Sequence, residues 1–169
     1  MKNKPLIFGL GILLLSLCSL TGAQAQQGGI GLRVGGHTAG ISGKYFMRES
    51  LALEGILGTG FGRRGFQLTA LIEQHADAFS VPGLRWFYGG GAHVGFFKGR
   101  YYHKRSSRHY EDSYNRTLTT VGIDGIVGLE YQITEIPLSL SLDFKPFFEG
   151  NRDGIFLYGD GALTVRYTF

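Results

Sequence analysis

The stretch from Tyr158 to Phe169 constrains the fold most, because its apolar and polar residues alternate along most of its length. Successive side chains of a β-strand point to opposite faces of the sheet, so a period of two describes a strand with one apolar and one polar face. The apolar face contains Gly161, Leu163, Val165, Tyr167 and Phe169, and the polar face contains Asp160, Thr164, Arg166 and Thr168. The pattern therefore predicts a two-faced strand here.

The first part of the chain has the pattern of a secretory signal peptide. Two lysines precede an apolar run over residues 6–20, and a small-x-small motif ends at Ala25. The run is shorter than the roughly 20 residues that a membrane-spanning helix needs, which argues against an uncleaved anchor. We expect cleavage before Gln26, which divides the chain into a signal peptide (1–25) and one mature domain (26–169).

Period-two alternation recurs after the signal peptide, and no segment there keeps a helical period. The chain contains 28 glycines but only 4 prolines, and 14% of its residues are aromatic, a composition that suits a barrel better than a disordered chain. Eight strands are expected, over residues 29–35, 39–46, 51–61, 66–75, 84–98, 118–133, 136–148 and 158–169, with a polar loop from Glu149 to Gly154 before the last strand. The predicted fold class is all-β, an antiparallel up-and-down transmembrane barrel.

The lengths of the connections predict an orientation in the membrane. Short turns follow the second, fourth and sixth strands, whereas the long polar segment 99–117 follows the fifth. Transmembrane barrels have short periplasmic turns and longer outer loops, so we expect a periplasmic N-terminus and an extracellular segment 99–117. At about 3.3 Å per residue and a tilt of about 40°, the strand from Trp86 to Phe96 spans roughly 25 Å, the height of the apolar band.

Aromatic residues near the two ends of the strands predict two girdles. The periplasmic girdle is expected to contain Tyr45, Trp86, Tyr88, Tyr131, Tyr167 and Phe169, and the outer girdle Phe61, Phe66, Phe96, Phe144 and Phe148. Aromatic girdles at both interfaces are typical of barrels that cross a membrane.

Charged residues fall on the face opposite the apolar one, which predicts that they point into the barrel. An eight-stranded barrel has an interior just wide enough for side chains to fill. A charge on the lipid face would instead cost roughly 2–4 kcal/mol at the middle of the membrane. We therefore expect a packed polar plug, with glycines leaving room for long side chains. Its members are expected to be Arg33, Lys44, Glu54, Glu73, Arg85, His93, Asp124, Glu130, Asp143, Lys145, Asp160 and Arg166.

Three segments resemble the small outer-membrane β-barrel domains of Gram-negative bacteria, the OmpX-like and OmpA-like barrels. They are residues Pro82 to His93, Gly122 to Tyr131 and Ile136 to Asp143. The resemblance implies the fold and a place in the outer membrane, and it supplies no single activity. The aromatic end of the last strand, Tyr167 and Phe169, resembles the signal that the barrel-assembly machinery reads, which implies that machinery as a partner during insertion.

Catalytic and cofactor-binding patterns are weak. The string Gly60-x-Gly62-x-x-Gly65 matches a dinucleotide fingerprint, but the residues after it alternate like a strand where the fingerprint needs a helix. His93 is expected to be the only histidine inside a strand, and a member of the polar network rather than a general base. Asp124 and Glu130 lie six residues apart on one strand, roughly 20 Å, which is too far for paired acid–base work. No catalytic residue and no cofactor are expected.

The segment 99–117 is the most distinctive surface feature that the sequence predicts, because it combines basic residues, histidines and tyrosines. Its spacing of His103, His109, Glu111 and Asp112 fits no zinc pattern, so no metal is expected. Basic residues interleaved with tyrosines can bind nucleic acid. On an outer-membrane barrel, the phosphates of lipopolysaccharide are a nearer binding partner than nucleic acid. The alternative is a solvated loop that binds nothing and only shields the rim of the barrel. The basic residues proposed for contact are Arg100, Lys104, Arg105 and Arg108.

The sequence thus predicts a monomeric integral outer-membrane barrel with a structural or cell-surface role, in contact with outer-membrane lipid and without nucleic acid or catalysis. Two alternatives stay open. One is a narrow pore or transport protein. The other is a lipid A-modifying barrel enzyme, although the Ser-His pair that such enzymes use cannot be located in this chain.

Overall fold

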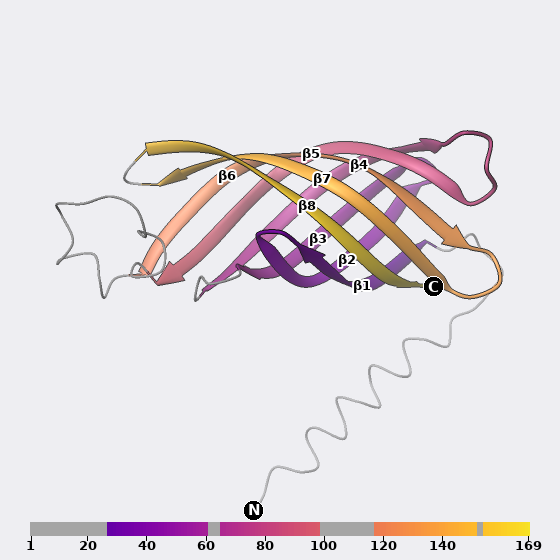
Figure 1. Cartoon of the computed structure of the whole chain (residues 1–169), viewed down its shortest axis with the longest axis horizontal. Coiled ribbons are helices and arrows are strands. Elements are labelled where there is room, and N and C mark those ends of the chain that lie inside the picture. Colours follow the sequence, from indigo (N-terminus) through magenta and orange to yellow (C-terminus); the bar gives the residue numbers. More distant parts are fainter. Residues whose placement is uncertain (1–26, 61–64, 99–116, 152–153) are drawn as a thin grey trace, which may run out of the picture.

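Eight antiparallel strands follow one another around a closed barrel in the order of the sequence (Figure 1). The computed structural model describes residues 27–60, 65–98, 117–151 and 154–169. The strands are β1 (Gly28–Gly35), β2 (Thr38–Arg48), β3 (Leu51–Gly60), β4 (Gly65–Asp77), β5 (Leu84–Lys98), β6 (Thr117–Ile133), β7 (Leu138–Asn151) and β8 (Gly154–Thr168). Each strand pairs with the next, and β8 closes the ring on β1, which confirms the predicted all-β, eight-stranded antiparallel up-and-down barrel. Within the described residues, no helix is long and apolar enough to cross a membrane.

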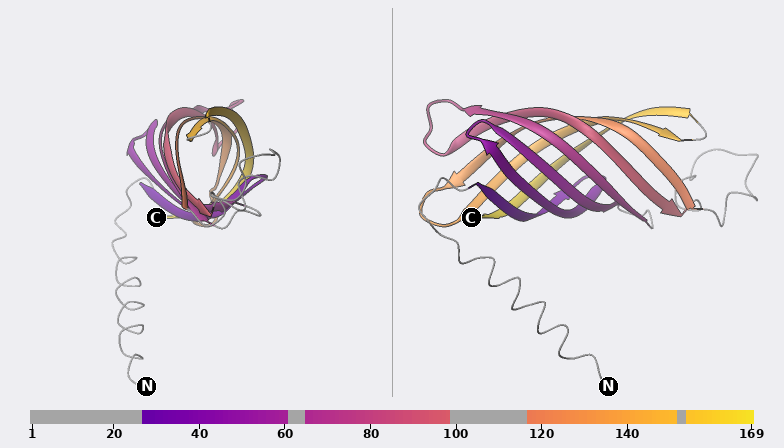
Figure 2. Two further views of the ribbon diagram at one scale, coloured as in Figure 1. Left: turned by 90° about the vertical axis from the view of Figure 1, so that its left-hand side faces the viewer. Right: turned by 180° about the vertical axis from the view of Figure 1, so that it is seen from behind.

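The ring is visible in the view along the barrel (Figure 2, left). The β4–β5 and β6–β7 connections lie at the same end as the C-terminus, and β7 ends and β8 begins at the other end (Figure 1). The expected signal peptide lies outside the described residues, as do the segment 99–116 and Phe61 of the expected outer girdle.

The boundaries of β7 and β8 differ from those expected. Residues 134–137 form the turn, so β7 begins at Leu138. The stretch from Glu149 to Gly154 was expected to be a polar loop, but β7 continues to Asn151, which pairs with Gly154 of β8. The prediction was wrong because it read the polarity of Glu149 as a loop signal, whereas in this barrel a polar residue within a strand points inward, and Glu149 is buried.

The two faces of the sheet have opposite character. Outward-facing apolar side chains are exposed, for example Leu32 at 67% and Ile123 at 64%, whereas Arg33, between Leu32 and Val34 on β1, is 1% exposed. The inner face also carries a small apolar cluster, which consists of Ile56, Leu71, Phe87 and Ile126. The barrel is therefore apolar outside and mainly polar inside, the reverse of a soluble domain.

Close backbone contact explains the glycines of the inner face. A Cβ atom added to Gly91 of β5 would lie 1.9 Å from the carbonyl oxygen of Ala70, and one added to Gly89 would lie 2.1 Å from that of Ile72. Both oxygens belong to the neighbouring strand β4. Glycine at these positions permits an approach that any side chain would obstruct.

Aromatic side chains lie on the outer surface towards both ends of the strands. Trp86 and Tyr88 stack with their ring centroids 5.1 Å apart near one end of β5, and Phe96 near its other end contacts Phe66 at 5.3 Å. The further exposed members of the expected girdles are Tyr45, Tyr131, Phe144, Phe148, Tyr167 and Phe169.

A charged lumen as the candidate functional site

The lumen contains three groups of buried charged side chains, and the first is centred on Lys44 of β2. The Lys44 Nζ atom lies 3.2 Å from Glu54, 2.8 Å from Glu73 and 2.9 Å from Glu130. These carboxylates come from β3, β4 and β6, so one ammonium group connects four strands. The same atom lies 4.3 Å above the centroid of Phe87, a favourable position for a cation over an aromatic ring.

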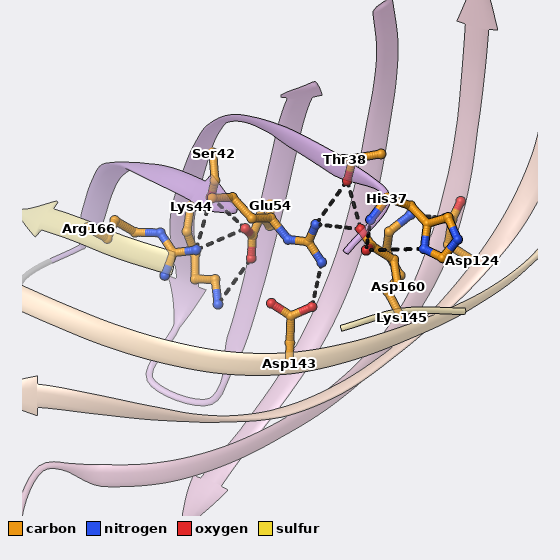
Figure 3. Close-up of polar contacts among 11 residues, drawn as sticks. His37, Thr38, Ser42, Lys44, Glu54, Asp124, Asp143, Lys145, Asp160 and Arg166 are labelled. Atoms are coloured by element: carbon orange, nitrogen blue, oxygen red, sulfur yellow. Dashed lines mark hydrogen bonds and ion pairs between the residues drawn. The ribbon is translucent and has the colours of Figure 1, made fainter. Parts of the chain in front are cut away.

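Arg166 of β8 extends this group (Figure 3). Its Nη2 atom lies 2.9 Å from Glu54 Oε1 and also donates a hydrogen bond of 2.9 Å to the Ser42 hydroxyl. The Ser42 hydroxyl donates in turn to Glu54 Oε1 at 2.5 Å. The Arg166 Nη1 atom lies 3.5 Å from Glu130 Oε2. The Lys44 cluster is defined here as Ser42, Lys44, Glu54, Glu73, His75, Glu130 and Arg166.

His75 of β4 is a member of this cluster that the sequence analysis missed. It is buried, with Nε2 3.6 Å from Glu130 Oε2, and its ring stacks on Phe87 with centroids 5.2 Å apart. The expectation that His93 is the only histidine inside a strand is therefore wrong. β4 runs two residues further than expected, to Asp77, which places His75 on the inner face by simple alternation with Glu73.

The second group surrounds Arg33 of β1. Its Nη2 atom lies 2.6 Å from Asp143 Oδ1 on β7, and its Nη1 atom lies 3.2 Å from Asp160 Oδ2 on β8. Asp160 also accepts hydrogen bonds from the Thr38 hydroxyl at 2.7 Å and from the His37 backbone N–H at 2.8 Å. One buried carboxylate thus connects the β1–β2 hairpin to β8 (Figure 3).

The third group is a chain of charges around His93 of β5. Its Nδ1 atom lies 2.7 Å from Asp124 Oδ2, and its Nε2 atom lies 3.5 Å from Glu149 Oε2. Asp124 also accepts a hydrogen bond of 2.6 Å from Lys145. The Lys145 Nζ atom lies 4.6 Å over the ring of Phe147, which itself meets the His93 ring edge-on. Glu149 is the second member of the lumen that the sequence analysis missed, because it was assigned to a loop.

Arg85 forms no ion pair with the described members of these groups, although it was expected in the inner network and pairs with Glu130 across the β5–β6 ladder. Its side chain is 30% exposed and donates a hydrogen bond to the backbone carbonyl of Glu49 in the β2–β3 turn. The nearest carboxylate oxygen is that of Asp77, at 4.0 Å, and its guanidinium lies 5.5 Å from the ring of Phe46. Arg85 is the second residue of β5, and its side chain stays partly exposed near this end of the strand.

The structure places the other expected network residues inside the barrel and buries each of them. They are Arg33, Lys44, Glu54, Glu73, His93, Asp124, Glu130, Asp143, Lys145, Asp160 and Arg166. Tyr167 and Phe169 lie on the outer surface, where the Phe169 backbone exchanges two hydrogen bonds with Gly28. The basic residues Arg100, Lys104, Arg105 and Arg108 and the candidate ligands His103, His109, Glu111 and Asp112 lie outside the described residues.

The charges of the lumen do not balance as the sequence suggested. Five bases against six acids were expected, but Arg85 leaves the set and Glu149 joins it. Among the described residues, the buried cations are then Arg33, Lys44, Lys145 and Arg166. The buried carboxyl groups are Glu54, Glu73, Asp124, Glu130, Asp143, Glu149 and Asp160, three more than the cations, with His75 and His93 as the other titratable groups.

The arrangement offers little to catalysis. Both ring nitrogens of His93 face carboxylate oxygens, so neither nitrogen faces a hydroxyl that it would activate as a nucleophile. Within the part of the chain that the structure describes, no group of three or more His, Cys, Asp or Glu side chains is placed to hold a metal ion.

Comparison with known proteins agrees with the fold. No known protein-family model matches the sequence, and no curated protein matches it. Among solved structures, the N-terminal β-barrel domain of OprF from Pseudomonas aeruginosa matches 86% of this chain and 100% of that domain, with a TM-score of 0.61 and 18% identity. A de novo designed transmembrane β-barrel matches 86% of this chain and 98% of its own, with a TM-score of 0.47 and 17% identity. At the level of the fold the predicted resemblance is confirmed: this chain is an eight-stranded antiparallel β-barrel like the OprF N-terminal domain.

Proposed function

We propose that this chain is an integral outer-membrane β-barrel protein with a structural or cell-surface interaction role, whose lumen is closed by its own charged side chains. The observation that carries the proposal is the inside-out distribution of polarity. Charged side chains such as Arg33 and Glu73 are buried in the lumen, while Leu142 and Ile123 on the opposite face are more than half exposed. This surface is compatible with lipid and incompatible with water.

The closed ring of strands supports a position in the membrane. Hydrocarbon offers no hydrogen-bond partners, so every backbone N–H and C=O group at that depth needs one within the protein. A closed barrel meets this requirement, and β1 and β8 complete the ring here. The fold similarity to the OprF domain supports the same location.

Ion pairs between distant strands support a closed lumen. Lys44 of β2 reaches Glu130 of β6, and Arg33 of β1 reaches Asp143 of β7. A solute that passed through the barrel would have to separate such pairs. Separating one partner from a buried ion pair costs roughly 3–5 kcal/mol, and this cost opposes an open channel through the barrel.

Two measurements test this proposal. The protein is expected to fold only in detergent or bilayers and to migrate differently on gels before and after heating. Recovery of a monodisperse folded protein from plain buffer would contradict a membrane location. In planar bilayers the folded protein is expected to give no steady current, and reproducible single-channel steps would contradict the closed lumen while leaving the membrane location intact.

A narrow cation-conducting pore is the second candidate, favoured by the excess of three buried carboxyl groups over buried cations in the described lumen. A lumen with a net negative charge attracts cations and repels anions. The bilayer measurement separates the two candidates, because a pore of this kind gives currents whose reversal potential shifts towards that of the cation in a salt gradient.

A lipid A-modifying activity receives less support. His93 is buried in the lumen between Asp124 and Glu149, away from the lipid-facing surface on which such an enzyme would act. We propose that the chain has no catalytic role. Unchanged lipid A in mass spectra of a strain that lacks the protein is the expected result, and a shifted acylation pattern would overturn the assignment.

The partners remain proposals. Lipopolysaccharide is proposed to meet the basic residues Lys104, Arg105 and Arg108, and outer-membrane lipid to surround the apolar face. Recognition of Tyr167 and Phe169 by the barrel-assembly machinery, and a monomeric state, stay predictions from the sequence.

A further inference from the structure

An aromatic side chain crosses the mouth of the lumen at the end of the barrel where the C-terminus lies. Phe46, near the end of β2, faces the lumen by alternation with Lys44 and is half-buried. Its ring meets the buried ring of His75 on β4 edge-on, with the ring centroids 4.9 Å apart. Because β3 separates β2 from β4, the Phe46 ring has to lie over β3 to make this contact.

The strand between the two rings leaves room for the contact. Ala52 of β3 pairs with Phe46 on one side and with Glu73 of β4 on the other. A side chain as small as alanine lets a ring from the neighbouring strand lie above it. Ala52 is 0% exposed although it is the second residue of its strand, which agrees with a ring that covers it.

The backbone of β2 is irregular at this point. Phe46 pairs with Ala52 and Arg48 pairs with Leu51, so Met47 is an extra residue and β2 contains a β-bulge. A bulge bends its strand and re-aims the side chains next to it, and bulges are common at the rims of barrels. On the β1 side, the Phe46 N–H donates to the carbonyl group of residue 27 at 2.7 Å. The ring is therefore directed over the mouth from a backbone that is held on both sides.

Arg85 of β5 contacts the same ring from the opposite wall. Its guanidinium carbon lies 5.5 Å from the centroid of the Phe46 ring, within the range of a cation–π contact. The guanidinium also donates a hydrogen bond to the Glu49 carbonyl in the turn that follows β2. β5 stands three strands away from β2, so the Arg85 side chain reaches across the mouth. These contacts give Arg85 a place in the layer that covers the mouth.

The Phe46 ring covers the Lys44 cluster through two further rings. His75, directly beneath it, is 1% exposed and stacks on Phe87, and Phe87 lies 4.3 Å below the Lys44 ammonium group. Water that entered from this end would reach His75 first and would then weaken the buried ion pairs, because charges attract each other more weakly in water than in a protein interior. Phe46 therefore stands between solvent and the cluster.

The other half of the mouth is held by hydrogen bonds. The Gln132 side chain of β6 donates to the Leu138 carbonyl of β7 and to the Thr168 hydroxyl of β8, both at 3.2 Å. Moving Gln132 would break both bonds. The Phe46 ring is instead held by its contacts with His75 and Arg85, so it can rotate away without the loss of a ladder bond or an ion pair.

We propose that Phe46 is a lid over this mouth of the lumen and that Arg85 is its latch. Rotation of the ring opens a path for water to His75, and the Arg85 guanidinium, held by the Glu49 carbonyl, keeps the ring in place. The inference rests on the proposed closed lumen. It assigns the control of access at this end to one apolar ring, above the ion pairs that fill the lumen.

The test measures how fast diethyl pyrocarbonate, a small reagent that acylates neutral histidine rings, modifies His75 in the folded protein in detergent micelles. Modified sites are identified by mass spectrometry. His37, whose side chain is 55% exposed, is the reference for a reactive site, and the buried His93 is the reference for a protected one. Phe46→Ala is expected to raise the rate at His75 by about tenfold or more and to leave His37 and His93 unchanged.

Three further variants separate the lid from a general loosening of the barrel. Phe46→Leu keeps an apolar side chain over β3, so its rate at His75 is expected within about threefold of the original. Arg85→Gln keeps the ring and removes the latch, so it is expected to raise the rate by about threefold or more. Phe66→Ala is the matched control, because it removes an exposed ring from the outer surface near the other end of β5. This control is expected to leave His75 protected.

The proposal is overturned if Phe46→Ala leaves the rate at His75 unchanged, or if His75 of the original protein reacts as fast as His37. An equal rise at His93 would show that the whole barrel has loosened, and it would also count against a lid. Should Phe46→Ala fail to fold, Arg85→Gln decides, because its position is partly exposed, and an unchanged rate at His75 overturns the proposal. Heat-modifiable migration and bilayer currents report on the barrel and the closed lumen separately, so failure of the lid is distinguishable from failure of the proposed function.

Discussion

Lys44 on β2 and Glu130 on β6 meet inside the barrel, with 2.9 Å between Nζ and Oε2. The two strands stand four apart in a ring of eight, so this ion pair crosses the lumen from one wall to the other. Lys44 also contacts Glu54 and Glu73 on the strands between them. The Lys44 side chain therefore links β2, β3, β4 and β6, so its substitution is the most direct test of the closed lumen.

Lys44→Met is expected to destabilise the barrel strongly. The change leaves three buried carboxyl groups without their common cation, and removing one partner of a buried ion pair costs roughly 3–5 kcal/mol. Urea unfolding in detergent, followed by the fluorescence of Trp86, measures the loss. Arg48→Met is the control, because Arg48 lies exposed on the same strand and its replacement is expected to matter little. Equal unfolding midpoints for the two variants would argue against a structural role of the cluster.

Glu130 and Glu73 are expected to differ although both contact Lys44. Glu130 Oε2 also lies 3.5 Å from Arg166 and 3.6 Å from His75, whereas Glu73 Oε1 has no hydrogen-bond donor. The cluster holds three carboxyl groups for two permanent cations, so one negative charge is in excess. Glu130→Gln is therefore expected to cost about 2–3 kcal/mol, and Glu73→Gln less than about 1 kcal/mol. The same unfolding assay checks both, and a larger loss for Glu73→Gln would reverse the proposed hierarchy.

Gly91→Ala is expected to destabilise the barrel, and Gly55→Ala is not. The added methyl group at Gly91 would lie 1.9 Å from the Ala70 carbonyl oxygen, whereas at Gly55 on the outer face nothing lies within 4 Å. Forcing a group into such contact costs about 1–3 kcal/mol, while an alanine in free space reduces the flexibility of the unfolded chain. Refolding yield in detergent and urea midpoints measure both variants. A tolerated Gly91→Ala would mean that β4 and β5 approach each other less closely than described.

Position in the membrane is tested by arginine on the outer face. Ile123 pairs with Ala92, near the middle of β5 between Trp86 and Phe96, whereas Ile155 lies near the start of β8. An arginine at the midplane costs roughly 2–4 kcal/mol and one near the interface about 0–1 kcal/mol. Ile123→Arg is therefore expected to lose much more stability in lipid vesicles than Ile155→Arg. Similar losses at the two sites would place the bilayer elsewhere on the barrel.

The basic segment is tested on cells. Trypsin added to intact cells is expected to cut near Lys104, Arg105 or Arg108, because segment 99–117 is proposed to lie outside the cell. Changing these three residues to Gln is expected to weaken lipopolysaccharide binding, with a loss that shrinks as salt screens the charges. Arg48→Gln, which removes one positive charge from an exposed position at the end of β2, serves as a comparison. Cleavage only after lysis would invert the proposed topology.

Much of the lumen could be predicted because alternation is a local property. Within a strand, the neighbours of an outward-facing residue point inward, so Arg33 follows from Leu32 and Val34 without knowledge of any partner. Where the strand ends were misjudged, the prediction failed. His75 and Glu149 were missed because β4 was expected to end too early and Glu149 was assigned to a loop. Arg85 was placed in a network with whose described members it forms no ion pair.

The sequence by itself determined that there are eight strands and which face most of their residues occupy, because each strand alternates with a period of two and is flanked by turns; the exceptions lie at misjudged strand ends, such as His75 and Glu149. Only the tertiary structure decided which charges meet. Arg33 and Asp160 are 127 residues apart and Lys44 and Glu130 are 86 apart, and their contacts depend on how far each strand is shifted against the next. Each strand could slide by two residues and keep its faces, so side-chain alternation does not specify this shift. Packing, ion pairing and backbone contact at glycines such as Gly91 select one register for the whole ring. In that register β1 pairs with residues 162–168 of β8.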